Sequence, residues 1–383
     1  MIEDESLRIY ATIMRGGTSK GVFLKESDLP QDPAIRDKAI LAIFGSPDPR
    51  QIDGLGGADV LTSKLALIGC PSRPDADVDF SFGQVEIEQA VIHYDGLCGN
   101  ISSAVGPYAI EEGFVKPVEP ITRVRVHSRN TQQIYYTDVQ VLDGKPRVSG
   151  DYRVDGVPGT GAKIDIDMSE TVGSRTGRLL PTGRPVDLVR LGNGKEVPIT
   201  LIDVVNPAIF ARAEDLGLRG DETPKEWTGL KDALALVEEI REKGVELMGL
   251  RDWEPRHPTP FLTFVSPSRD YMNTLTGEPI ACGDVDFLAR MIILGEMHKT
   301  FAGSVTCVTG AAAAIEGSVV NQVAKLTAGQ TDIRIGHPGG IVTASVEVER
   351  QGDEFIARRV CYGRTARRLM DGYVYVPRSR LDM

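Results

Sequence analysis

The apolar positions in the first part of the chain alternate as in strands, and turns interrupt them often. Runs rich in β-branched and aromatic residues predict strands over residues 11–13, 21–24, 78–82, 85–87, 91–94, 124–127 and 134–141. Helical patterns are fewer. Residues 33–44 are amphipathic, whereas residues 101–112 are apolar on all sides, which predicts a helix buried inside its domain.

The later part of the chain has a clearer helical period. Leucine, isoleucine and valine recur at helical spacing over 225–247, and helices are also expected over 284–294 and 304–316. Strands are predicted over 198–205, 262–265 and 341–348. The final segment, from residue 364 onward, is expected to return to the first part of the fold as a strand.

One of the two buried helical segments is a repeat of the other. Residues 98–115 read CGNISSAVGPYAIEEGFV, and residues 302–319 read AGSVTCVTGAAAAIEGSV. A gapless alignment that places residue 302 on residue 98 equates two pairs of glycines, a Glu-Gly pair and a valine. In this alignment Cys98 is matched by Ala302. The repeat predicts a duplicated fold with a cleft between its halves, in which only the first half carries a thiol.

The pattern and the repeat together predict an α+β protein of two pseudo-symmetric lobes. Each lobe is expected to be a mostly antiparallel sheet wrapped around a central helix. A chain of 383 residues is too long for one ordinary core. The Gly-, Pro- and Arg-rich stretch 173–187 is typical of a connection. We therefore expect a first lobe of residues 1–186 plus 362–383 and a second lobe of residues 187–361.

Composition narrows the class of partner and the compartment. A net charge of −11 argues against nucleic acid and against an anionic membrane surface. The acidic N-terminus is unlike a signal peptide, and no apolar stretch approaches the length of a membrane span. Five irregularly spaced cysteines indicate reduced thiols and a cytoplasmic location. Four of them are expected to be small buried apolar residues: Cys70, Cys282, Cys307 and Cys361.

The segment MRGGTSKG, residues 14–21, lies between two predicted strands. Its adjacent glycines allow a turn with exposed N–H groups, and its hydroxyls and arginine add donors and positive charge. These features predict a cradle for a carboxylate or phosphate, although a simple hairpin turn is the better interpretation if the segment is taken alone. The candidate ligands are Arg15, Gly16, Gly17, Thr18 and Ser19.

Two further residues are candidates for proton transfer. Lys64 precedes the apolar run 65–68, which indicates a position partly withdrawn from water, where an amine becomes less basic. A surface lysine beside a strand is the alternative. Cys98 opens the first buried helix with Gly99 and Asn100, where free N–H groups and the helix dipole bind anions and favour a thiolate.

The start of the second buried helix offers the same anion-binding geometry without a thiol. The candidates there are His298, Lys299, Gly303 and Ser304. Cys307 falls inside that helix, so a structural role suits it better. No metal site is predicted, because the histidines are scattered and neither an HExxH motif nor paired CxxC motifs occur.

Five segments together resemble the PrpF-like isomerases, and the resemblance runs nearly end to end. They are MRGGTSKG at 14–21, GSPDPRQIDGLGGAD at 45–59, LTSK at 61–64, CGNISSAVGPYAI at 98–110 and RTARRLMDGYVYV at 364–376. The family includes 2-methylaconitate isomerase, 4-oxalomesaconate tautomerase, aconitate Δ-isomerase and 3-methylitaconate Δ-isomerase. HKTFAG at 298–303 and VNQV at 320–323 look most like the methylitaconate branch.

The resemblance implies a fold similar to diaminopimelate epimerase and a lysine and a cysteine in the catalytic positions, matching Lys64 and Cys98. It implies an allylic isomerase that moves a C=C bond in an unsaturated di- or tricarboxylate such as methylitaconate, aconitate, 2-methylaconitate or 4-oxalomesaconate. No cofactor and no metal are expected. The partner is this small molecule, and a homo-oligomer is compatible with the sequence.

Two other functions stay open at this point. One is a two-base epimerase or racemase of the diaminopimelate type, against which Ala302 argues because a second thiol is required there. The other is a non-catalytic carboxylate-binding protein, which the presence of both Lys64 and Cys98 disfavours.

Overall fold

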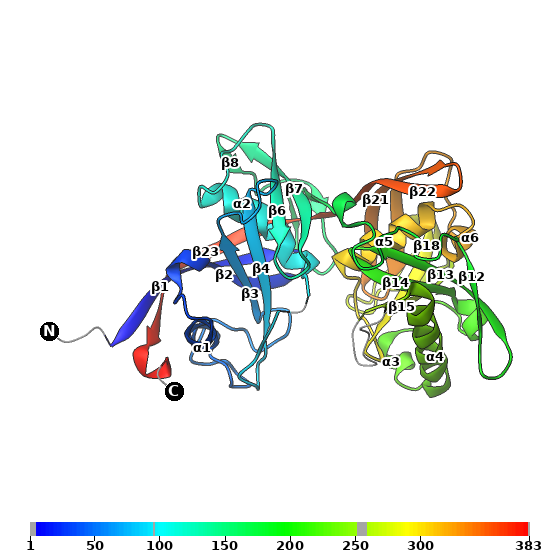
Figure 1. Ribbon diagram of the computed structural model, residues 1–383, viewed down its shortest axis with the longest axis horizontal. Coiled ribbons are helices and arrows are strands. Elements are labelled where there is room, and N and C mark those ends of the chain that lie inside the picture. Colours follow the sequence, from blue (N-terminus) through cyan, green and yellow to red (C-terminus); the bar gives the residue numbers. More distant parts are fainter. Residues whose placement is uncertain (1–4, 95, 251–258, 382–383) are drawn as a thin grey trace. The chain divides into compact units, whose positions relative to one another are not determined.

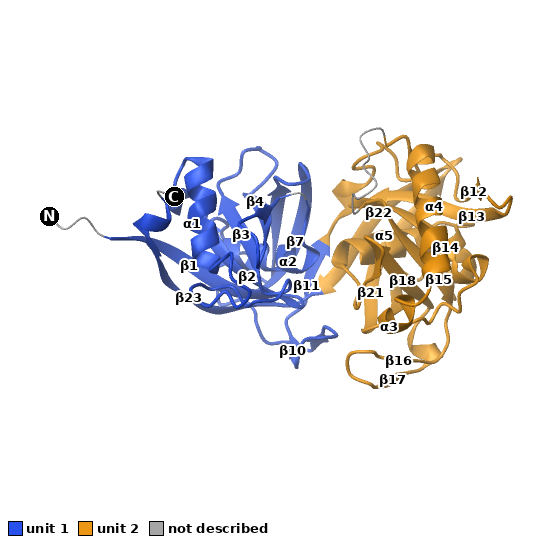
Figure 2. Cartoon of the chain, turned by 90° about the horizontal axis from the view of Figure 1, so that it is seen from below, with its two compact units in different colours: residues 1–166, 364–383 blue, residues 167–363 orange. Residues whose placement is uncertain are grey.

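The computed structural model describes residues 5–94, 96–250 and 259–381, and the chain divides into two compact units (Figure 1). Unit 1 comprises Met1–Ile166 and Arg364–Met383, and unit 2 comprises Asp167–Gly363 (Figure 2). Residues 167–186, which the sequence groups with the first lobe, therefore lie in unit 2. The Asp203 carboxylate holds part of this segment by accepting hydrogen bonds from the Ser174 hydroxyl at 2.8 Å and the Thr176 backbone N–H at 2.7 Å.

In unit 1 a mostly antiparallel sheet surrounds the central helix α2, Gly99–Glu111 (Figure 1). Its strands are β1 (Ser6–Gly16), β2 (Ser19–Lys25), β3 (Lys64–Gly69), β4 (Val78–Val85), β5 (Ile92–His93), β6 (Ile121–Ser128), β7 (Gln133–Leu142), β8 (Lys145–Pro146) and β23 (Ala366–Pro377). A small hairpin joins β9 (Tyr152–Arg153) to β10 (Thr160–Gly161), and β11 (Ile164–Asp167) leads into unit 2. β23 pairs with β1, so the C-terminal segment returns to unit 1 as predicted.

The helix α1, Pro33–Phe44, has the predicted bounds and packs on the sheet of unit 1. The Asp32 carboxylate caps it by accepting hydrogen bonds from the N–H groups of Ala34 and Ile35 at 2.9 and 3.1 Å. Its buried residues share a core cluster with alternate residues of β1, Ile9 and Ala11. These odd-numbered positions of β1 therefore point to the α1 side.

In unit 2 the central helix is α5, Gly303–Ala314. Its strands are β12 (Asp187–Arg190), β13 (Glu196–Val204), β14 (Asn206–Arg212), β15 (Phe261–Pro267), β18 (Phe287–Ile293), β19 (Glu296–Met297), β20 (Asp332–His337), β21 (Gly340–Gln351) and β22 (Glu354–Arg364). The other elements are α3 (Pro224–Trp227), α4 (Lys231–Met248), α6 (Val319–Val323) and the small pair β16 (Tyr271–Met272) and β17 (Pro279–Ile280). In the described ranges, no helix combines the length and the apolar character needed to cross a membrane.

The two central helices have equivalent starts. Both begin at the residue that the sequence alignment equates, and each is preceded by an extended N-cap residue, Cys98 or Ala302. The hydroxyl of Ser102 donates to the carbonyl of Cys98 at 2.9 Å, and that of Thr306 donates to the carbonyl of Ala302 at 3.0 Å. The structure therefore confirms the fold of two similar lobes, each built around a buried helix.

Equivalent glycines bring each helix close to its sheet. A Cβ atom added to Gly310 of α5 would lie 2.5 Å from the Cβ of Ala344 in β21, and one added to Gly106 of α2 would overlap the hydroxyl of Thr137 in β7. Real Cβ atoms do not approach this closely, so the helix–sheet distance in each unit depends on glycine.

One predicted helix is wrong. Residues 284–294 contain the strand β18, which pairs with β15 and is buried along nearly its whole length. A strand covered on both faces reads as a continuous apolar run, which periodicity does not separate from a buried helix. Two smaller corrections concern boundaries: residues 78–87 hold one strand, β4, and residues 225–247 are divided between α3 and α4.

The prediction of four buried cysteines is half right. Cys307 in α5 and Cys361 in β22 are buried, but Cys70 and Cys282 are exposed. Cys70 follows the last residue of β3, and Cys282 lies in a short 3-10 turn, so neither belongs to a regular core element.

The Gly310→Ala substitution tests the close packing of α5. We expect it to lower the free energy of unfolding, because overpacking costs about 1–3 kcal/mol and the better helix propensity of alanine offsets at most about 1 kcal/mol. Urea unfolding measures the change. The control is Gly283→Ala, whose added Cβ would have no heavy atom within 4 Å. Equal stability of the two variants would contradict the packing described here.

Candidate functional site

The site residues predicted from the sequence fall into two groups, one in each unit. In unit 1 the turn between β1 and β2 lies against the start of α2. A Cβ atom on Gly16 would overlap the carbonyl oxygen of Asn100, and one on Gly17 would overlap the Asn100 side-chain oxygen. Gly17 also has a φ of 49°, in the left-handed region. Glycine is therefore required at both positions for this turn to reach the helix.

The Asn100 side chain joins three segments of unit 1. Its Nδ2 donates to Thr18 Oγ1 at 2.9 Å and to Ser19 Oγ at 3.4 Å. Its Oδ1 accepts from Arg364 Nε at 3.2 Å. The amide is thus fixed in orientation, and it ties the β1–β2 turn and the segment before β23 to the first turn of α2.

The glycine turn is held from its other side by backbone and by Arg15. The Gly17 N–H donates to the carbonyl of Thr365 at 2.9 Å, so this N–H of the predicted cradle already has an acceptor. Arg15 Nη1 donates to the carbonyls of Gly17 and Thr365 at 2.9 and 2.8 Å. Burial lowers the pKa of Arg15, and the positive charge of Arg367 lowers it further.

Lys64 is a buried amine at the first position of β3. Its exposed fraction is 8%, and its Nζ donates to Gln84 Oε1 at 2.7 Å. The Gln84 Nε2 donates to the backbone carbonyls of Ser63 and Val60 at 2.9 and 3.3 Å, which leaves the amide oxygen facing the lysine. The Phe82 ring centroid lies 5.3 Å from Nζ. Within the described ranges, no carboxylate forms an ion pair with this amine.

Cys98 is the N-cap residue of α2, half-buried and not in a disulfide. No side chain caps this end of the helix, so its first N–H groups and the helix dipole favour negative charge next to the thiol. Sequence reasoning does not single out Tyr135 in β7, which is buried and whose hydroxyl has no hydrogen-bond partner among the described residues. Burial raises the pKa of Tyr135, Ser102 lowers it and the Cys98 sulfur raises it.

In unit 2 the start of α5 carries no thiol. Ala302 is its N-cap residue, and a Cβ on Gly303 would lie 2.5 Å from the ring of Tyr362. Ser304 is half-buried in the first turn of this helix. Cys307 is fully buried, and its Sγ donates to the carbonyl of Val360 at 3.9 Å, so the structural role predicted for this cysteine is confirmed.

His298 is a partly buried imidazole just before α5. Its Nδ1 accepts a hydrogen bond from the Thr300 N–H at 3.1 Å, which places the proton of the neutral ring on Nε2. Burial lowers the pKa of His298. The ring is therefore neutral at pH 7 and can donate from Nε2. The adjacent Lys299 is exposed.

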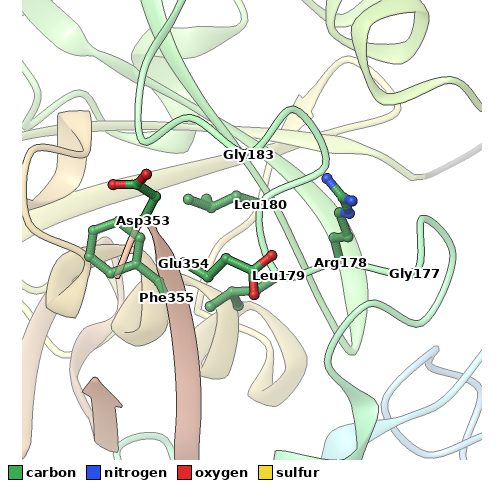
Figure 3. Close-up of a pocket in the computed structure, with 8 residues that line it drawn as sticks. All are labelled: Gly177, Arg178, Leu179, Leu180, Gly183, Asp353, Glu354 and Phe355. Atoms are coloured by element: carbon green, nitrogen blue, oxygen red, sulfur yellow. The ribbon is translucent and has the colours of Figure 1, made fainter. Parts of the chain in front are cut away.

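Unit 2 also contains a pocket of about 340 Å³ away from these residues (Figure 3). It is lined by Gly177, Arg178, Leu179, Leu180, Gly183, Asp353, Glu354 and Phe355. Two carboxylates and one guanidinium leave it without an excess of positive charge, and none of the predicted site residues lines it. It is a poor candidate for binding a di- or tricarboxylate.

Two similar lobes around buried helices define the class of diaminopimelate epimerase-like folds. A hydroxyproline epimerase structure from Agrobacterium vitis matches with a TM-score of 0.53 at 12% identity, over 97% of this chain and 93% of that one. That likeness concerns the fold alone. The chain belongs to the PrpF protein family, whose match extends over residues 6–377. The family resemblance predicted from the sequence is thereby confirmed.

Several relatives are similar over nearly their whole length. The chain is 48% identical to 3-methylitaconate isomerase of Eubacterium barkeri over 382 residues, which is 98% of this chain and 99% of the relative. It is 40% identical to (4E)-oxalomesaconate Delta-isomerase of Novosphingobium sp. (strain KA1) over 366 residues, 95% and 96% of the two chains. A crystal structure of methylitaconate-delta-isomerase matches with a TM-score of 0.90 at 48% identity, over 99% of this chain and 98% of that one. The protein is an isomerase.

The buried His298 predicts a specific dependence of stability on pH. Its pKa in the folded chain lies below the value of about 6.5 for an unfolded histidine, so the unfolded chain binds the proton more readily. As pH falls below about 6.5, the free energy of unfolding should decrease by a contribution that levels off below the folded-state pKa. His298→Asn keeps an acceptor for the Thr300 N–H and should lack this contribution.

Urea unfolding of both chains between about pH 8 and pH 5 measures the difference. His93→Asn, at an exposed histidine, is the control for removing a titratable ring. The same pH dependence of the free energy of unfolding in the wild type and in His298→Asn would contradict the conclusion that burial lowers the pKa of His298.

Proposed function

We propose that this isomerase moves the C=C bond of an unsaturated dicarboxylate of the methylitaconate kind by a 1,3-proton shift. The observation that carries the proposal is the buried Lys64 amine, which has no carboxylate partner among the described residues, in the same unit as Cys98, the N-cap residue of α2. The 48% identity to a protein named 3-methylitaconate isomerase supports the substrate class, and it exceeds the 40% identity to the oxalomesaconate isomerase.

The reaction has three chemical requirements. A base removes a proton from the carbon next to the double bond, the electron pair of that C–H bond shifts into a dienolate, and an acid returns a proton at the other end of the allylic system. Because the charge of the intermediate spreads onto a carboxylate, hydrogen-bond donors must stabilise that carboxylate. The overall composition of the substrate is unchanged.

Lys64 fits the part of a proton-transfer group. The amine is buried and has no carboxylate partner among the described residues, so a substrate carboxylate can supply the counter-charge when it binds. Gln84 Oε1 accepts a hydrogen bond from one N–H of the amine, so the lone pair of the nitrogen points away from the amide. The fixed Gln84 therefore orients the proposed reactive nitrogen.

Cys98 is the proposed second proton-transfer group. It lies at the start of α2, where the helix dipole and the backbone of the first turn favour a bound anion, so the substrate carboxylate is proposed to bind beside Gly99 and Asn100. Either of the two groups is able to remove the proton while the other returns it. The hydroxyls of Thr18 and Ser19 are further proposed donors in unit 1. In unit 2, the proposed anion-binding residues are His298, Lys299, Gly303 and Ser304.

A two-base epimerase is the second candidate, and the structure of the α5 start disfavours it. Such an enzyme needs a thiol at the N-cap of each central helix, and Ala302 occupies the second one. Cys307 does not replace it, because this cysteine is fully buried within α5.

The Lys64→Met variant tests the proton transfer. We expect kcat to fall at least about 10²-fold, because a proton-transfer group of this kind contributes about 10²–10⁴-fold, and deuterium incorporation from heavy water at the allylic carbon is lost as well if Lys64 is the base. Equilibrium binding of the substrate should survive, since the methylene stem is retained. Proton NMR follows both conversion and exchange.

The Cys98→Ser variant complements this test and assigns the two roles. The variant that lacks the base loses both exchange and conversion, whereas the variant that lacks only the proton donor keeps exchange and loses conversion. Lys145→Met, at an exposed lysine of β8, is the control for removing a lysine charge. Retention of full exchange and conversion by Lys64→Met would refute the proposed catalytic role.

The substrate assignment is tested by a panel of unsaturated acids. We expect kcat/KM for methylitaconate to exceed that for cis-aconitate, trans-aconitate, 2-methylaconitate and 4-oxalomesaconate by about 10-fold or more, because one substituent of the substrate is worth about 10–200-fold in a fitted pocket. A higher value for another acid would reassign the substrate. Inversion of an amino acid without any turnover of the panel would favour the epimerase.

A further inference from the structure

Two arginines of unit 1 stand directly opposite each other in neighbouring strands. Arg15 of β1 is paired with Arg367 of β23 in the antiparallel register. Directly opposed residues of an antiparallel pair share a face of the sheet, and like charges in this arrangement are destabilising. Among the described residues, no carboxylate forms an ion pair with either arginine.

The next arginine along β23 shows how this sheet neutralises a charge elsewhere. Arg368 binds three carboxylates: Nε contacts Glu111 at 2.6 Å, Nη2 contacts Glu112 at 2.6 Å and Nη1 contacts Asp371 at 2.8 Å. The unit thus supplies three acids to one arginine and none to the neighbouring pair. The opposed Arg15 and Arg367 therefore lack the counter-charge that Arg368 has.

Both arginines line a pocket of about 530 Å³ in unit 1. The rest of its wall comes from the segment 148–161, which includes the β9–β10 hairpin, and from Thr365. Ser149 and Thr160 add hydroxyl groups, and no residue of the lining is an Asp or Glu. The volume lies in the range of about 300–1,000 Å³ that is typical of small-molecule sites.

The pocket is separate from the proposed proton-transfer groups. Arg15 is at an odd-numbered position of β1, as are Ile9 and Ala11, which pack with α1. The adjacent Gly16 is at an even-numbered position and contacts Asn100 of α2. Neither Lys64 nor Cys98 lines the pocket.

Arg15 still has donors to offer. Only its Nη1 donates to backbone carbonyls, those of Gly17 and Thr365. These two bonds fix the plane of the guanidinium, and its other N–H groups have no hydrogen-bond partner in the described part of the chain. A planar guanidinium presents its N–H groups in a fork that matches an oxyanion, and two such forks match a doubly charged one.

We propose that the pocket between Arg15, Arg367 and the β9–β10 hairpin is a second anion site, which binds a compact doubly charged oxyanion without transforming it. The dianion supplies the counter-charge that the opposed arginines lack. Arg15 also holds Gly17, whose turn contacts Asn100 at the start of α2. Occupancy of the site therefore reinforces the turn next to the Cys98 helix start.

Arg367→Gln is the variant that tests the site, because Arg367 is exposed and makes no bond to the glycine turn. The probes are succinate, which has no double bond to shift, and inorganic phosphate. Each is compared with chloride at equal ionic strength. The urea unfolding midpoint and calorimetric binding are measured for the wild type, for Arg367→Gln and for Arg50→Gln, a control at another exposed arginine of unit 1.

In the wild type and in Arg50→Gln, we expect succinate or phosphate to raise the urea unfolding midpoint more than chloride does. The probe that binds more tightly in calorimetry identifies the ligand class as carboxylate or phosphate. Arg367→Gln should lose at least about 10-fold in affinity at this site. In chloride alone it should be more stable than the wild type, because the like-charge pair is gone. An unchanged response of Arg367→Gln, or a wild-type response equal to that in chloride, would overturn the proposal.

Discussion

The arrangement of unit 1 depends on one close approach, that of the Gly16–Gly17 turn to the first turn of α2. The helix start is useful for chemistry only if its N–H groups and its thiol are held in a defined position relative to the strands that carry Lys64. Asn100 provides this connection with one amide, which binds both the β1–β2 turn and Arg364. Any side chain on either glycine would separate the turn from the helix.

Unit 2 repeats the backbone of the helix start with alanine in place of cysteine at the N-cap. The hydroxyl of Thr306 binds the carbonyl before α5 as that of Ser102 does before α2, so the local backbone is the same with alanine or cysteine at the N-cap. The geometry of the helix start is therefore a property of the fold and does not depend on which side chain occupies the N-cap position.

Local sequence signals were sufficient for the elements whose pattern is unambiguous. The amphipathic helix α1 was predicted with its correct ends, since Asp32 and Pro33 mark the start and Gly45 the end. The repeat located both central helices. β18 was missed because a strand buried on both faces has no period. The hydrogen bond from Lys64 to Gln84 was missed because Gln84 comes from the neighbouring strand β4. Which side chains meet across strands depends on the register of strand pairing, and a single sequence does not reveal that register.

The distribution of the thiols has a consequence for chemical labelling. Cys70 and Cys282 are exposed and Cys98 is half-buried, whereas the other two cysteines are enclosed in the core. An alkylating reagent will therefore modify up to three sulfurs in the native chain, and neither Cys70 nor Cys282 is a proposed reacting group. Inactivation by such a reagent becomes a measure of Cys98 alone only in a chain in which Cys70 and Cys282 have been replaced by serine.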